Sequence, residues 1–355
     1  KTIPVDVTRG KIPVSSVDAA YMIDQTTGYI KLSKFSETSY EEFMQNMEML
    51  QKQGLKSLVF DLRGNGGGFM NEAVDIADEF LDGDKLIVYT EGVNSKKREY
   101  RCKRPGLFES GKLVLLVNET SASASEVLAG ALQDWCRATI VGRRTFGKGL
   151  VQEQYQLRDG SAIRLTIARY YTPLGRSIQR SYEKGKKVYM DDLWERFNNG
   201  ELVSEDSMKN HNSKNFTTNC NDTLYGGGGI SPSVFIPVDT SRAQHQANRM
   251  AVTVNVSNYV YNYYLQHKSE VEKYKTATDF ANGFIQNDQL WNGLIQYTVS
   301  DSIKPGSLAG KEKELVLQQL KALLARYRWR NSGFYQVLNS GDAMVLKALE
   351  EVKKG

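Results

Sequence analysis

A serine-rich turn is the first part of the chain that could carry chemistry. Residues 118–126 (NETSASASE) follow an apolar run that ends at Val117 and precede a helical pattern. A serine between a buried strand and a helix start is exposed at a sheet edge, beside N–H groups that can hold an oxyanion. The turn therefore suggests nucleophilic catalysis. The same residues are also typical of a helix cap, and the motif alone favours capping.

A nucleophilic serine needs a base, because its hydroxyl is a weak nucleophile at neutral pH. Lys148 is the best candidate, since no histidine lies in this region. A lysine accepts a proton only as the neutral amine, so apolar neighbours and close backbone must disfavour the ammonium. Gln152 could orient that amine or be an ordinary strand residue. The chain's histidines all lie downstream, at positions 211, 245 and 267.

A glycine-rich turn is the second candidate. Residues 61–68 (DLRGNGGG) follow the apolar run 58–60, and consecutive glycines can present backbone N–H groups without side-chain obstruction. This arrangement suits an anion or an oxyanion. We expect Asp61 and Arg63 to brace the turn as an ion pair rather than to react.

A rival interpretation is nucleotide binding. Residues Gly142–Lys148 match the first seven positions of the phosphate-binding loop GxxxxGK[ST]. The eighth position is Gly149, which lacks the hydroxyl that would hold Mg²⁺, and the following LVQEQYQL alternates like a strand instead of opening a helix. We therefore rank nucleotide binding well below nucleophilic catalysis.

The elements that position these residues alternate between strand and helix patterns, which predicts an α/β core. We expect strands near residues 29–35, 57–61, 85–92, 112–117 and 138–142, with helices near 39–53, 72–81 and 124–135. Strand-like segments at 151–157, 162–172 and 234–238 predict an antiparallel extension. Residues 182–226 read as a polar surface excursion, and the pattern beyond residue 240 is helical.

Composition sets further limits. The net charge of +5 is scattered along the chain, so we expect a solvated surface and no nucleic-acid partner. No apolar run approaches the roughly 20 residues that span a bilayer. Three cysteines without CxxC or Cys/His spacing favour neither a metal site nor a disulfide framework, so we expect buried or idle thiols, and we expect no cofactor.

Several long motifs in one order resemble the carboxyl-terminal processing (tail-specific) serine peptidases. They are DLRGNGGG, SASASEVLAGALQD, RATIVG with TFGKGLVQ, YYTPLGRSIQ and GGGGI, spread over residues 14–238. The resemblance implies that Ser123 is the nucleophile, Lys148 the general base and Gln152 its orienting partner. The implied oxyanion hole consists of the backbone N–H of Ala124 and of Gly67 or Gly68.

The resemblance also implies a fold and a setting. We expect a crotonase-like α/β peptidase core at residues 14–240 and a helical C-terminal domain at 241–355. Residues 1–13 would be the remnant strand of an upstream PDZ-like module. The family is usually exported, which implies a periplasmic or extracytoplasmic location.

The predicted function is endopeptidase cleavage near the C-termini of unfolded or tailed proteins, through an acyl-enzyme on Ser123. Protein or peptide substrates are the expected partners. Membrane association through an N-terminal segment outside this chain and homo-oligomerisation stay open, as does the alternative of a non-catalytic peptide-binding scaffold.

Overall fold

The computed structural model describes residues 4–10, 14–183, 185–205, 214–241, 244–245, 249, 254–298 and 305–354. A six-stranded sheet forms its centre, and its strand order is β1-β2-β3-β6-β7-β12. The first pair is antiparallel, and every other pair is parallel. The strands are β1 (Val17–Met22), β2 (Thr27–Leu32), β3 (Ser57–Asp61), β6 (Lys112–Val117), β7 (Thr139–Gly142) and β12 (Val234–Phe235).

Helices cover both faces of this sheet. Helices α1 (Ser39–Lys52), α2 (Met70–Asp78) and α3 (Ala124–Asp134) share one hydrophobic core with one face. Helix α12 (Ala343–Lys353) packs on the other face through Met344, Val345 and Ala348. Parallel strands buried on both faces are expected to be continuously apolar, as β3 and β6 are.

A second sheet extends the core. It is antiparallel, with the order β5-β4-β9-β8. Its strands are β4 (Leu86–Glu91), β5 (Arg98–Arg101), β8 (Leu150–Gln156) and β9 (Ala162–Tyr171). The pattern predicts the α/β class and an antiparallel extension, and the structure contains both. The prediction that the segment near residues 234–238 belongs to that extension is wrong, because it forms β12, which pairs in parallel with β7 in the central sheet. The crotonase-like relationship stays a prediction.

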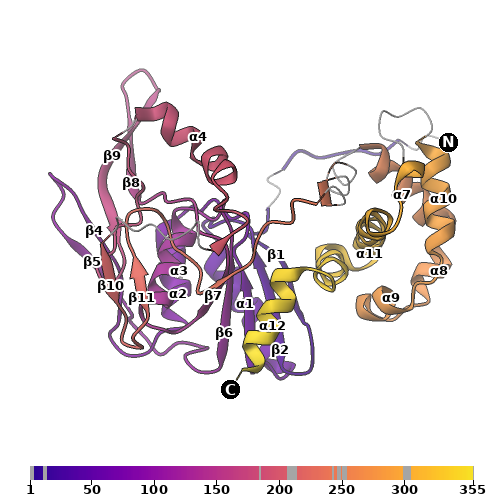
Figure 1. The fold of residues 1–355 in the computed structure, drawn as a ribbon, viewed down its shortest axis with the longest axis horizontal. Helices are drawn as coiled ribbons and strands as arrows, with labels where there is room; N and C mark the ends of the chain where they lie inside the picture. The colour runs from indigo at the N-terminus through magenta and orange to yellow at the C-terminus, as the bar shows by residue number, and fades with distance from the viewer. Residues whose placement is uncertain are drawn as a thin grey trace.

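The described residues beyond 254 are mainly helical and have a hydrophobic core of their own. Figure 1 shows α7–α11 gathered to one side of the sheets, while α12 returns to the central sheet. None of the described helices is long and apolar enough to cross a membrane. The elements are α7 (Val254–Gln266), α8 (Lys268–Glu272), α9 (Ala277–Gly283), α10 (Asn287–Tyr297), the 3-10 turn η1 (Pro305–Ser307) and α11 (Lys311–Asn339).

The predicted domain boundaries at residues 13 and 240 stay predictions. Residues 4–10 are exposed and form no strand in the described structure. The rest of the predicted remnant strand lies partly outside the described residues. The stretch 182–226, expected to be a surface excursion, contains helix α4 (Gly185–Asn198) and the hairpin β10 (Asn215–Thr217) and β11 (Thr223–Tyr225).

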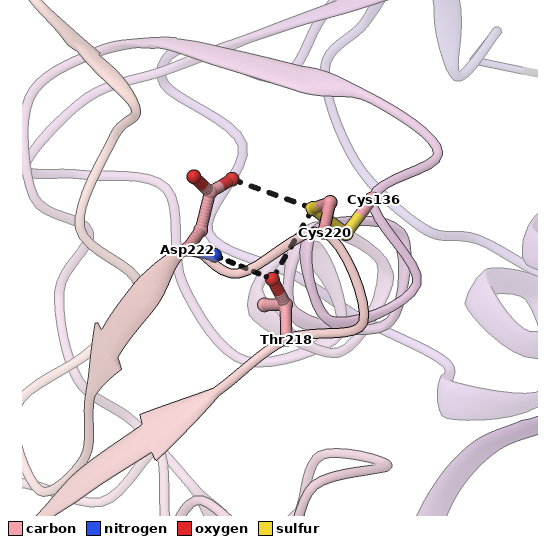
Figure 2. The surroundings of a disulfide bond; sticks show 4 residues. All are labelled: Cys136, Thr218, Cys220 and Asp222. Atoms are coloured by element: carbon pink, nitrogen blue, oxygen red, sulfur yellow. Dashed lines mark hydrogen bonds between the residues drawn. A yellow bond between two sulfur atoms is a disulfide. The ribbon is translucent and has the colours of Figure 1, made fainter.

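The expectation of idle thiols is wrong for two of the three cysteines. Cys136 and Cys220 form a disulfide, while Cys102 is a buried free thiol. Figure 2 shows the bond beside Thr218 and Asp222, where the Asp222 N–H donates to Thr218 Oγ1 at 3.0 Å. The partners are 84 residues apart in sequence, so local cysteine spacing could not reveal the pair. The bond ties the β10–β11 turn to the C-terminal end of α3.

Reduction of this disulfide is expected to lower the free energy of unfolding by roughly 2 to 5 kcal/mol, because it closes a long loop of chain. Denaturant unfolding with and without a phosphine reductant measures the effect. The Cys220→Ser variant is the control, and reductant should leave its midpoint unchanged. Thiol titration of the denatured, unreduced protein should find Cys102 alone. If the reductant leaves the denaturant midpoint of the wild-type protein unchanged, the disulfide assignment is wrong.

Candidate active site

Three segments singled out in the sequence meet at one edge of the central sheet. The glycine-rich turn follows β3, the serine turn follows β6, and the Lys148 segment follows β7. These strands are parallel neighbours in the order β3-β6-β7, so their carboxyl ends lie side by side. In open α/β sheets this is the edge where ligands bind.

The structure separates the three serines of the turn. Ser121 is buried, and its hydroxyl donates to the Leu62 carbonyl at 2.9 Å. Ser125 is also buried and donates to the Asn65 carbonyl at 2.9 Å. Ser123 is only half-buried. The serine implied as nucleophile is thus the accessible one, while its two neighbours join the serine turn to the glycine-rich turn.

Ser123 has a strained backbone. Its φ of 56° and ψ of −114° lie outside the regions that residues with a side chain prefer, at a cost on the order of 1 to 3 kcal/mol. It is the N-cap residue of α3, and its backbone N–H donates to the Glu126 side chain, so the capping interpretation and the catalytic one describe the same residue. Ala124 begins the helix, where backbone N–H groups lack intrahelical acceptors.

Gly67 packs directly against Ser123. A Cβ added to Gly67 would lie 2.7 Å from the Ser123 Cβ and 2.7 Å from the Ala122 carbonyl oxygen. The φ of 95° also favours glycine, so both the lack of space and the backbone conformation exclude other residues here. Asn65 holds the two turns together, because its carbonyl accepts from Ala122 N–H and its Oδ1 accepts from Gly67 N–H. The glycine-rich turn is thereby fixed beside the serine.

Glu126 joins the serine turn to the Lys148 segment, a role that sequence reasoning missed. Its Oε2 accepts from the backbone N–H of Ser123 and of Lys148, each at 2.8 Å. Its Oε1 accepts from Gly147 N–H at 2.7 Å and from the Thr145 hydroxyl. Burial raises the pKa of Glu126, and these hydrogen bonds oppose that rise. The Ser-x-x-Glu pattern in the sequence predicts a helix cap. The additional bonds from Gly147 and Lys148 give Glu126 its second role, which the pattern does not reveal.

The segment that carries Lys148 is held on its other side as well. Gly149 N–H donates to Gln179 Oε1 at 2.9 Å, and the buried Arg196 of α4 donates to the Thr145 carbonyl at 2.8 Å. The Arg180 guanidinium stacks 4.0 Å from the Phe146 ring centroid. Lys148 itself is half-buried. The backbone position of the predicted base is therefore well defined.

The side chains of the predicted catalytic group are less closely associated. Among the described residues, Lys148 makes no side-chain hydrogen bond to Ser123 or to Gln152. Gln152 is exposed in β8, directly after a register shift between Val151 and Gln152. The extra residue at this shift is Ile167 of β9, so β8 itself keeps its regular alternation, and in the described structure Gln152 faces solvent without a bond to Lys148.

Asp61 anchors the glycine-rich turn, and the predicted ion pair with Arg63 is present. Arg63 Nη2 lies 2.7 Å from Asp61 Oδ2, while Lys31 and the Tyr29 hydroxyl also bond this carboxylate. Burial alone would raise the pKa of Asp61. The charges of Arg63 and Lys31 and the hydrogen bonds outweigh burial and hold this pKa well below the ordinary value.

A depressed pKa in the folded state makes the contribution of Asp61 to stability depend on pH. The contribution is present above the unfolded value of about 3.8 and is lost as the pH falls below it. We expect Asp61→Asn to lower the free energy of unfolding at pH 7 by roughly 3 to 5 kcal/mol, since the buried Lys31 loses its counter-charge and the half-buried Arg63 loses one of two. The loss should shrink between pH 4 and pH 2.

Urea unfolding across that pH range measures the effect, with Asp84→Asn as the control. Asp84 lies on the surface, with its side chain 82% exposed. A difference in unfolding free energy between Asp61→Asn and the parent that is the same at every pH would contradict the assignment.

The phosphate-loop interpretation does not fit this geometry. Strand β8, not a helix, follows Lys148. The N–H groups of Gly147 and Lys148 are already donated to the Glu126 carboxylate, which would also repel a phosphate. The backbone N–H groups at the end of Gly142–Lys148 therefore bind the Glu126 carboxylate and are not free to bind a nucleotide phosphate.

Comparisons with known proteins support the family suggested by the motifs. Residues 26–185 match the model of Peptidase family S41, and residues 247–330 match a Family of unknown function (DUF8443). A carboxyl-terminal-processing protease of Synechocystis sp. is 42% identical over 178 residues, which are 49% of this chain and 41% of that protein. The carboxy-terminal processing protease CtpA of Bacillus subtilis is 35% identical over 178 residues, 50% of this chain and 38% of that protein.

Among solved structures, the photosystem II D1 C-terminal processing protease is 29% identical, with a TM-score of 0.46. The match covers 65% of this chain and 50% of that one. The chain thus spans about two fifths of the length of these curated relatives.

Proposed function

We propose that this chain is a serine endopeptidase with Ser123 as nucleophile and Lys148 as general base. The match of residues 26–185 to the model of Peptidase family S41 supports this proposal. The observation that carries the proposal is the convergence on Glu126. One carboxylate oxygen accepts from the backbone N–H of both residues, which makes neighbours of two positions 25 residues apart in sequence.

In the proposed mechanism, Ser123 attacks the scissile carbonyl as the neutral Lys148 amine takes its proton, and the same proton then passes to the leaving amine. The Ala124 N–H at the start of α3 and a glycine N–H hold the oxyanion. Gly67 already donates its N–H to Asn65, which favours Gly68 as the second donor. Water then hydrolyses the acyl-enzyme.

Gln152 would orient the Lys148 amine only after a rearrangement of the start of β8. Apo sites are often loose and tighten when substrate binds, so the open Ser123–Lys148 geometry is compatible with this role. No cofactor takes part in the proposed reaction.

We further propose cleavage near the C-termini of unfolded or tailed proteins, in an extracytoplasmic compartment. The relatives' names supply the first point. The Cys136–Cys220 disulfide supports the second, since such bonds persist in oxidising compartments.

The test is incubation of the purified chain with a permanently unfolded protein and a folded one of similar size, followed by mass analysis of the fragments. We expect fragments from the unfolded protein only, with the first cuts near its C-terminus. A chain that binds the unfolded protein and releases it intact would instead be the non-catalytic scaffold.

A further inference from the structure

The C-terminal helix α12 contacts the glycine-rich turn directly. Asp342 is the N-cap of α12, and its Oδ1 accepts from Met344 N–H at 2.9 Å and from Val345 N–H at 3.0 Å. Its other oxygen, Oδ2, lies 2.7 Å from Arg63 Nη1. One carboxylate thus caps the last helix and bonds the turn that follows β3.

Arg63 lies between two carboxylates. Its Nε and Nη2 bond the buried Asp61 at the end of β3, and its Nη1 bonds Asp342. All three groups of the guanidinium are therefore used, and a bidentate pair of this kind fixes geometry as well as charge. Arg63 is confined from both sides.

The turn beyond Arg63 reaches the proposed nucleophile within a few residues. Gly64 N–H donates to Asn118 Oδ1, and Asn65 accepts from Ala122 N–H and from the Ser125 hydroxyl. Gly67 then packs on the Ser123 Cβ. A shift of Arg63 would move the donors of the oxyanion hole relative to Ser123.

Helix α12 is itself well anchored. Met344, Val345 and Ala348 are buried against the face of the central sheet opposite α1–α3. The helix is therefore a rigid support for Asp342, although 279 residues separate Asp342 from Arg63.

We propose that Asp342 is a positioning residue for the proposed peptidase reaction, acting through Arg63 on the glycine-rich turn. Helix α12 of the C-terminal region then helps to position the active site. This inference rests on the function proposed above.

The Asp342→Asn variant tests it, because asparagine caps a helix as well as aspartate does but offers Arg63 a weaker, neutral partner. We expect kcat on an unfolded protein substrate to fall about tenfold, with KM and the melting temperature close to those of the parent. The matched control is Glu350→Gln, which removes the same charge from an exposed site on α12 whose partner is Lys347. It should leave kcat unchanged.

The outcomes are distinct. An unchanged kcat for Asp342→Asn, or a loss equal to that of Glu350→Gln, would overturn the inference and leave the proposed function intact. If Asp342→Asn lowers the melting temperature but not kcat, Asp342 acts only as a helix cap and the inference is wrong. A parent chain that never cuts the substrate would overturn both proposals together.

Discussion

Replacing Ser123 with alanine is expected to lower kcat by at least about 10⁴-fold, because the acyl-enzyme can no longer form. The substitution keeps the Cβ that packs against Gly67 and the backbone strain at φ 56°, so the fold should persist. The Ser123 hydroxyl makes no capping hydrogen bond, so the free energy of unfolding should change by less than about 1 kcal/mol. Fragment release from an unfolded protein and thermal unfolding measure the two effects.

Ser125→Ala is the matched control. Its hydroxyl is buried and donates to the Asn65 carbonyl, so this variant should melt earlier yet still cut. We expect Ser123→Ala to be stable but inactive, and Ser125→Ala to be less stable but active. This contrast separates an effect on catalysis from an effect on folding. Cleavage by Ser123→Ala at the parent rate would refute the assigned nucleophile.

Replacing Lys148 is expected to lower kcat by roughly 10² to 10⁴-fold, the range that general bases contribute. The informative variant is Lys148→Arg, since a guanidinium keeps the positive charge but does not give up its proton in proteins. We expect it to be as inactive as Lys148→Met. Steady-state cleavage measures the loss, and Lys52→Met, at an exposed lysine that ends α1, serves as control.

Added alkylamine should restore part of the activity of Lys148→Ala, because a small amine can occupy the space left and accept the serine proton. Restored activity would identify a chemical role that a structural lysine would not show. An active Lys148→Arg variant would show that the charge, and not proton transfer, is what the site needs.

The sequence predicted the core elements well where the physics is local. Strands β3 and β6 are continuous apolar runs, and α1 follows from Phe43, Met47 and Leu50 at helical spacing. Since carboxyl ends of neighbouring parallel strands share one edge, the three motif segments were bound to meet once the strands paired. The meeting of Gly67 with Ser123 is a consequence of that pairing.

What the sequence could not predict depends on contacts between distant residues. Cys136 and Cys220 are joined across 84 residues, and Asp342 reaches Arg63 across 279. Neither pair has a local signature. The Ser-Ala-Ser-Glu pattern that ends at Glu126 predicts only a helix cap, because the bonds of Glu126 to Gly147 and Lys148 exist only after β7 is placed beside β6. The sequence pattern of β8 likewise does not reveal that Gln152 is exposed.

The most direct measurement is acid quenching of the chain during turnover of a peptide thioester, followed by intact and peptide mass analysis. We expect a mass increase equal to that of the acyl group, located on the peptide that contains Ser123 and absent from Ser123→Ala. An acyl group found on Cys102 instead, or turnover with Ser123 unmodified at every quench time, would contradict it.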